Sequence, residues 1–197
     1  MKVVEISRTN LPVMLFKHKE AWETWLGKRY GSSVGLWLRL AKKSAKLQSV
    51  TYQEALEVAL CYGWIDGQKK TYDGESWLQK FTPRKPKSIW SKINKTKAIG
   101  LIEQGRMQPA GLAAIESAKG DGRWDAAYDS HKTAVPSHDF QAALNKNAKA
   151  KAFFAALNSQ NKYAILFRIQ TAKKVETRQK RIKQFVQMLA KHEKLYS

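Results

Sequence analysis

Cysteine, acidic residues and long apolar runs are all scarce in this chain of 197 residues. The one cysteine, Cys61, excludes an intramolecular disulfide and any metal site built from several cysteines. No apolar run approaches the roughly 18 residues that a membrane-spanning helix requires, so we expect none. The first residues, MKVVEISRTN, have no apolar stretch behind Lys2. We therefore expect no signal peptide and a cytoplasmic protein.

The shortage of acids leaves a large positive charge. There are 36 Lys and Arg against 16 Asp and Glu, a formal net charge of +20. Such a field attracts nucleic acid, an anionic lipid surface or an acidic protein, although lysines that only maintain solubility are the alternative. Seven Trp and 43% hydrophobic residues exclude a disordered polycation. The charge is clustered, since residues 173–194 hold eight basic and two acidic residues, and this clustering favours a surface that faces a polyanion.

Local patterns predict a helix-dominated α+β fold. Apolar spacing predicts a helix over 20–30 and a strand over 34–40, and Thr51 with Glu54 forms a capping box before a helix over 52–62. Asp-Gly pairs predict a hairpin or short meander over 64–82. Further helices are expected from Ser88 or Ser91 to 104, and at 110–119, 137–146, 147–157, from 159, and at 175–192.

Turn residues without periodicity over 121–136 mark a domain boundary. We expect an α+β domain over 1–122, containing a small antiparallel sheet or hairpin. A basic helical module over 123–197 follows it. The helices of that module are too short to be stable alone, so they are predicted to pack as a small bundle.

Several segments resemble one family. The strings LCYGWIDGQKK and FTPRKPKSIWSKIN, then GRM with PAG, resemble signature segments of the YdeI/OmpD-associated, or bacteriocin-protection, family. The strings VPSHDFQAALNKNAKAKAFFAAL and AKKVETRQKRI resemble its helical module, and the resemblance extends from about Phe16 to Phe185. It implies a stress or resistance role against bacteriocins or cationic antimicrobial peptides, without a known reaction.

The resemblance and a concentration of polar and aromatic side chains point to one candidate pocket for a small ligand or a partner. Its residues are Trp64, Asp66, Gly67, Phe81, Arg84, Ser88, Trp90, Ser91 and Asn94. Structural roles explain each residue taken singly. Asp66-Gly67 is typical of a turn, Ser88 and Ser91 of helix caps, and the tryptophans of a core. A buried Asp66–Arg84 pair that fixes the hairpin would give the same pattern.

A second candidate surface is the last helix, where basic residues flank an inward apolar stripe. These residues are Lys174, Arg178, Lys180, Arg181 and Lys183. They are expected to contact phosphates, or else to form a solvated outer face. Because no helix-turn-helix or RNA-binding signature accompanies them, any binding of nucleic acid should be salt-sensitive and non-specific.

Catalytic patterns are largely absent. The four histidines are scattered, no phosphate-binding glycine loop is present, and Cys61 is expected to be a buried hydrophobe. We therefore predict no catalytic residue, metal or cofactor. The favoured function is a non-enzymatic, cytoplasmic resistance protein that acts through the pocket. The alternative is an accessory protein that binds nucleic acid non-specifically, and an enzyme that uses Asp66 is a third, weaker hypothesis.

Overall fold

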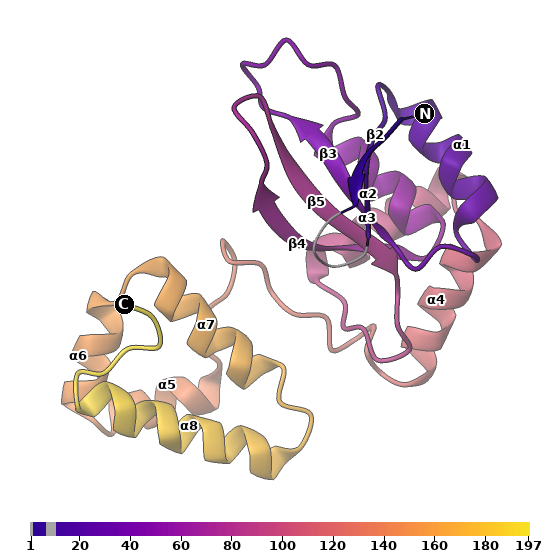
Figure 1. The fold of residues 1–197 in the computed structure, drawn as a ribbon. Coiled ribbons are helices and arrows are strands. Elements are labelled where there is room, and N and C mark those ends of the chain that lie inside the picture. The colour runs from indigo at the N-terminus through magenta and orange to yellow at the C-terminus, as the bar shows by residue number, and fades with distance from the viewer. Residues whose placement is uncertain (1, 7–10) are drawn as a thin grey trace. The chain divides into compact units, whose positions relative to one another are not determined.

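A computed structural model describes residues 2–6 and 11–197. It contains two compact units (Figure 1). The first unit combines Met1–Ser88 with Asn94–Asp125, and the second combines Ile89–Ile93 with Ala126–Ser197. Within the described ranges, no helix is long and apolar enough to cross a membrane.

The first unit is built on a five-stranded sheet with the order β1-β2-β3-β5-β4. The strands are β1 (Lys2–Ile6), β2 (Pro12–Leu15), β3 (Leu36–Ala41), β4 (Trp64–Thr71) and β5 (Ser76–Pro83). Neighbouring strands are antiparallel, except that β2 and β3 are parallel. The α+β class and the β4–β5 hairpin are therefore confirmed, in a sheet that is mixed rather than wholly antiparallel.

The predicted turn at Asp66-Gly67 is wrong. Asp66 pairs with Phe81 inside the β4–β5 ladder, and the register shifts between Asp66 and Lys69. The buried Gln79 side chain stabilises this irregular stretch, since its Nε2 donates to the carbonyls of Gly67 at 2.9 Å and Gln68 at 3.2 Å. A β-bulge thus occupies the site, because Asp and Gly suit a bulge as well as a turn. The chain reverses at 72–75, where the second Asp-Gly pair, Asp73-Gly74, forms the predicted turn.

Helices α1 (Lys19–Arg29) and α2 (Tyr52–Cys61) contribute to an aromatic core with the sheet. Trp22 is fully buried, and its ring centroid lies 5.8 Å from that of Phe81 and 6.3 Å from that of Trp64. The capping box of Thr51 with Glu54 is present at the start of α2. These local signals therefore place α2 as the sequence predicts.

Two glycines allow α2 to approach α4 (Pro109–Gly120), which follows α3 (Lys92–Glu103). A Cβ at Gly111 would lie 2.3 Å from the Cys61 carbonyl oxygen. Gly63 has φ +71°, and a Cβ there would lie 2.8 Å from the Ala110 carbonyl oxygen. Both positions therefore require a residue without a Cβ.

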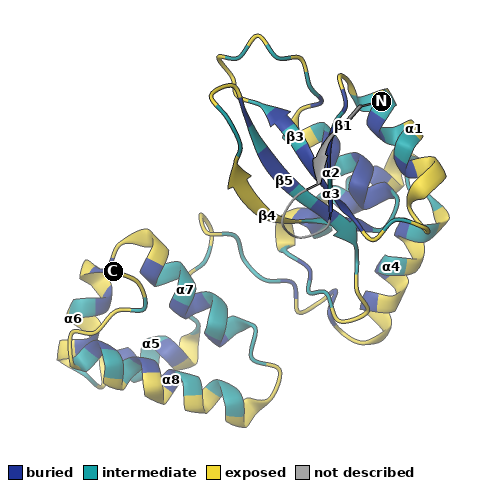
Figure 2. Ribbon diagram, viewed as in Figure 1, coloured by how far each residue is buried: buried dark blue, intermediate teal, exposed yellow. Residues whose placement is uncertain are grey.

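The second unit is a bundle of four helices, α5 (His138–Asn145), α6 (Ala148–Ala156), α7 (Ser159–Gln170) and α8 (Val175–Ala190). Buried residues from all four helices form one hydrophobic core, which includes Phe140, Ile165 and Leu189, and Figure 2 colours the bundle by burial. The buried Asn161 fixes the C-terminal residues, since its Oδ1 accepts from the amides of Leu195 at 3.0 Å and Tyr196 at 2.9 Å. The predicted C-terminal bundle of helices is confirmed.

The short segment 89–93 is bonded to the second unit. The Tyr128 amide donates to the Trp90 carbonyl at 2.9 Å, and the Lys92 amide donates to the Tyr128 carbonyl at 2.8 Å. An ion pair of 2.7 Å joins the Lys92 ammonium to Asp129. Backbone hydrogen bonds to Tyr128 therefore place this segment in the second unit. Its composition does not distinguish it from the residues on either side, so the sequence did not predict this.

Candidate functional site

Four residues of the predicted pocket lie on the β4–β5 hairpin, and three of them, Trp64, Asp66 and Phe81, pack or hydrogen-bond within the first unit. Trp64 and Phe81 are buried in the core, and Trp64 Nε1 donates to the Tyr30 carbonyl at 3.1 Å. The Tyr52 hydroxyl donates to Asp66 Oδ2 at 2.9 Å, which joins α2 to β4. Gly67 is exposed, and Arg84 is half-buried just after β5.

The remaining pocket residues divide between the two units. Ser88 and the buried Asn94 belong to the first unit, whereas Trp90 and Ser91 belong to the second. Ser88 Oγ accepts from the Lys85 amide at 3.1 Å and so closes a turn. Ser91 directly precedes α3, which begins at Lys92. Four open grooves among the described residues are lined by other side chains, so the pocket stays a prediction.

Arg178 of the basic helix is engaged within its own unit. Its guanidinium donates to Asp139 at 2.6 and 2.8 Å, to the Ser137 hydroxyl at 2.7 Å and to the Ile169 carbonyl at 3.0 Å. These hydrogen bonds hold the pKa of Asp139 well below its usual range. Arg181 donates to the Arg168 carbonyl. Both arginines therefore join α8 to its neighbours.

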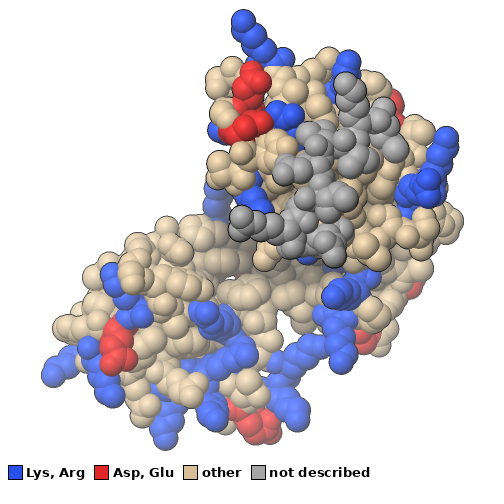
Figure 3. Space-filling model, viewed as in Figure 1, with Lys and Arg blue, Asp and Glu red and all other residues tan. Residues whose placement is uncertain are grey.

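The lysines of the second unit have a different environment. Fifteen of the 36 basic residues and only four of the 16 acids lie in this unit. Two of those acids, Asp129 and Asp139, form ion pairs with Lys92 and Arg178. The exposed lysines on or beside α5, α6 and α8 are Lys146, Lys149, Lys151, Lys173, Lys174, Lys180, Lys183, Lys191 and Lys194. Figure 3 shows Lys and Arg side chains at many separate places on this unit's visible face. We name the nine lysines the lysine surface.

An open groove of about 470 Å³ runs between α5 and α8. Ala143, Ile182 and Val186 provide apolar lining, and Lys146 and Lys183 provide cations from the two helices. Val175, at the start of α8, is 65% exposed and also lines the groove. The lysine surface therefore includes a shallow apolar depression.

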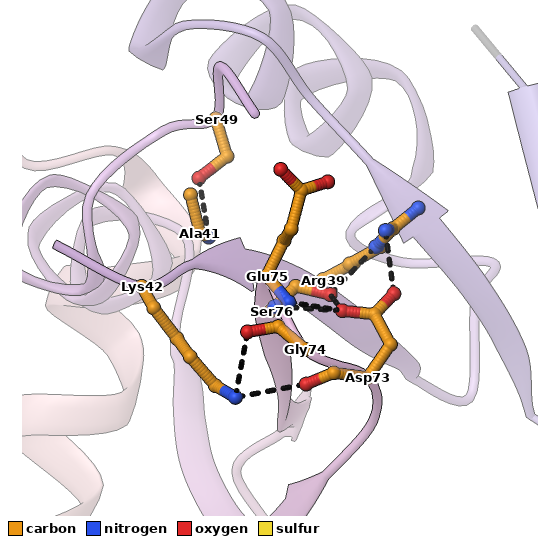
Figure 4. A network of polar contacts seen from close by, with 8 residues as sticks. All are labelled: Arg39, Ala41, Lys42, Ser49, Asp73, Gly74, Glu75 and Ser76. Carbon is orange, nitrogen blue, oxygen red and sulfur yellow. Dashed lines mark hydrogen bonds and ion pairs between the residues drawn. The ribbon is translucent and has the colours of Figure 1, made fainter. Parts of the chain in front are cut away.

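A network that sequence reasoning missed fastens the hairpin end of the sheet (Figure 4). Arg39 donates to Asp73 Oδ2 at 2.7 Å and to the Ser76 hydroxyl at 2.8 Å. Asp73 Oδ1 accepts from the Ser76 amide at 2.7 Å and the Glu75 amide at 3.0 Å. Lys42 Nζ donates to the carbonyls of Asp73 at 2.8 Å and Gly74 at 3.0 Å. Asp73 therefore closes the turn, and its partner Arg39 is 34 residues away in sequence.

Within 2–6 and 11–197, no group of three or more His, Cys, Asp or Glu side chains could hold a metal ion. Burial raises the pKa of the Cys61 thiol to about 11, because the thiolate would be poorly solvated. The neutral thiol is a poor nucleophile.

Comparisons with known proteins give two family matches, one over the part of the chain that holds most of the sheet and one over the four-helix bundle. Residues 14–114 match the model of a family described as a domain of unknown function, DUF8412. Residues 133–192 match the family model described as bacteriocin-protection, YdeI or OmpD-associated. No curated protein and no solved structure matches the chain.

The first match spans just over half of the chain and contains the hairpin motifs, and the second spans α5 to α8. The resemblance of the C-terminal segments is therefore confirmed. The chain belongs to the DUF8412 family and carries a bacteriocin-protection, YdeI or OmpD-associated module at its C-terminal end.

Proposed function

We propose that this protein is a non-enzymatic resistance protein whose C-terminal module binds nucleic acid without sequence preference. The observation that carries the proposal is the lysine surface, where exposed cations greatly outnumber the remaining acids. A surface of this kind attracts phosphates and releases their counterions.

The different environments of the arginines and lysines of α8 support the proposal. Arg178 and Arg181 hold α8 in place, whereas Lys174, Lys180 and Lys183 are exposed. Flexible ammonium groups reach phosphates as point charges, and they do not read base edges. Binding should accordingly depend on salt more than on sequence.

The charge also constrains how such a protein would protect a cell. A surface this basic repels cationic peptides, so direct capture of the peptide is electrostatically disfavoured. We therefore propose an indirect, cytoplasmic role, in which contact with nucleic acid accompanies the protective response.

The test is a salt titration of binding to a mixed-sequence 20-base-pair DNA and to an RNA of equal length. The variant Lys174→Glu, Lys180→Glu, Lys183→Glu removes three exposed cations of α8. The matched control, Lys43→Glu, Lys46→Glu, Lys85→Glu, makes the same charge change on exposed lysines of the first unit.

Wild-type binding should weaken steeply with salt. The α8 variant should lose on the order of 0.9 in log–log slope for each phosphate contact removed. The control should retain most of the wild-type slope. Absence of binding at low salt, or equal losses in the two variants, would overturn the proposal.

A further inference from the structure

An open groove with a volume of about 910 Å³ lies along α1 in the first unit. It is lined by the end of β2 and one side of α1, and Phe16 and Trp25 give it aromatic walls. This volume lies within the range of roughly 300–1,000 Å³ that is typical of small-ligand sites. Trp25 lies in the helix that apolar spacing predicts over 20–30, and no binding role was predicted for it from the sequence.

The Trp25 indole packs against three aromatic rings of the core. It stacks on the buried Trp22 ring, with centroids 5.5 Å apart and planes 13° apart. The Trp64 ring meets it edge-on at 5.9 Å, and Phe16 lies at 6.1 Å. Because Trp22 covers one face of the half-buried indole, the part that lines the groove is its opposite face or edge. A ring fixed in this way is a stacking platform.

Three cationic side chains line the groove together with Trp25. Lys28 and Arg29 follow Trp25 by three and four residues, so all three side chains share one face of α1. Lys17 lines the groove from the end of β2. None of these three cations takes part in an ion pair between described residues of 11–197. The carboxylate in the groove, Glu20, contacts its neighbour His18 at 3.0 Å.

We infer that this groove binds a nucleotide of single-stranded nucleic acid, with the base stacked on Trp25 and the phosphate held by Lys28 and Arg29. A planar platform selects an aromatic group, and the cations one turn away select an anion attached to it. A nucleotide carries both, whereas the bases of an intact duplex are already stacked. The inference rests on the proposed function, to which it adds a preference for single strands.

The indole N–H signals in a proton–nitrogen NMR spectrum provide the test. The Trp25 signal is assigned as the one that the variant Trp25→Phe removes. The full chain is titrated with a ten-residue thymidylate strand, with an abasic strand of the same length and with thymidine 5′-monophosphate. We expect the Trp25 signal to shift with the thymidylate strand and not with the abasic strand. A shift with the monophosphate as well would extend the site to free nucleotides.

Affinity gives a second, independent readout. The variant Lys28→Glu, Arg29→Glu should bind the thymidylate strand about tenfold more weakly, a loss comparable to that of one stacked base. The control Lys43→Glu, Lys46→Glu makes the same charge change on exposed lysines outside the groove, and should lose much less. Equal losses, equal affinity for the abasic strand, or an unmoved Trp25 signal at saturation would each overturn the inference.

The variant of Lys174, Lys180 and Lys183 separates this inference from the proposed function. If both hold, that variant binds more weakly yet shows the full Trp25 shift at saturation. If its affinity is unchanged and Trp25 still shifts, the proposed function fails and the stacking site stands.

Discussion

Arg178 on α8 binds both carboxylate oxygens of Asp139, which lies in the first turn of α5, at 2.6 and 2.8 Å. The same guanidinium also reaches a backbone carbonyl of α7 at 3.0 Å. One side chain of the basic helix therefore connects three of the four helices in the module.

Replacement of Arg178 by alanine should destabilise the module. The expected cost is about 1–2 kcal/mol, since charge-assisted hydrogen bonds are lost but Asp139 is about half exposed and solvent screens the pair. Urea unfolding followed by circular dichroism measures this change. Lys180→Ala, which removes an exposed cation from the same helix, should change stability by less than about 0.5 kcal/mol.

The same pair predicts a pH dependence. The pKa of Asp139 is lower in the folded protein than in the unfolded chain, so its contribution to stability is complete above the unfolded value. That contribution is lost as the pH falls below about 4, where the unfolded carboxylate takes up its proton. The stability difference between wild type and Arg178→Ala should therefore shrink in acid. A difference that stays constant from pH 7 to pH 3 would contradict this account.

Asp73→Ala should weaken the end of the hairpin. The substitution removes the acceptor for the Glu75 and Ser76 amides and the partner of Arg39. We expect a lower urea midpoint and faster amide hydrogen exchange at residues 72–76. Asp125→Ala, which alters an exposed acid elsewhere in the first unit, should leave that exchange unchanged.

Gly111→Ala should destabilise the first unit by about 1–3 kcal/mol, the usual cost of overpacking. The new methyl group would lie 2.3 Å from the Cys61 carbonyl oxygen, so α4 would have to move away from α2. Gly120→Ala is the control on the same helix, because no atom lies within 4 Å of its added Cβ. Thermal melts of the two variants should differ clearly, and equal melting temperatures would refute the close approach.

The Cys61 thiol should react slowly while the protein is folded. It is 1% exposed, and burial raises its pKa to about 11, so little thiolate forms at pH 8. A chromogenic disulfide reagent should detect one thiol per chain in urea and almost none in buffer. Rapid labelling of the folded protein would show that the α2–α4 contact opens readily.

Asp66 offers a test of the predicted pocket. Asp66→Asn retains an oxygen that can accept from Tyr52, so the variant should fold and bind nucleic acid as the wild type does. Bacterial survival under a bacteriocin should likewise be unchanged if the lysine surface carries the function. A folded variant that binds nucleic acid but no longer protects would favour the pocket instead.

Sequence reasoning located most elements because their signals are local. The capping box of Thr51 with Glu54 and the apolar spacing along 175–192 each lie within one helix. The parallel pairing of β2 with β3 depends on distant residues, so no local pattern reports it. Asp66-Gly67 was misread because a bulge and a turn favour the same residues.

The candidate surfaces follow the same rule. The run of positive charge predicted a basic last helix. It did not predict which of the cations would form hydrogen bonds to neighbouring helices. Arg178 and Arg181 acquire that role only from partners on α5 and α7. The groove beside Trp25 likewise depends on Phe16 from the end of β2 lying next to α1.

The path of the chain through segment 89–93 has a consequence for how the protein can be divided. The backbone enters the second unit at Ile89, leaves it after Ile93 and returns at Ala126, so residues 94–125, with most of α3 and all of α4, interrupt that unit in the sequence. A fragment that starts at residue 133, where the family match begins, would lack Trp90, Lys92 and Tyr128. Conversely, one proteolytic cut within 94–125 would remove no residue of the second unit. Segment 89–93 would then be held to residues 126–197 by non-covalent contacts alone. The protein is thus better dissected by nicking than by truncation.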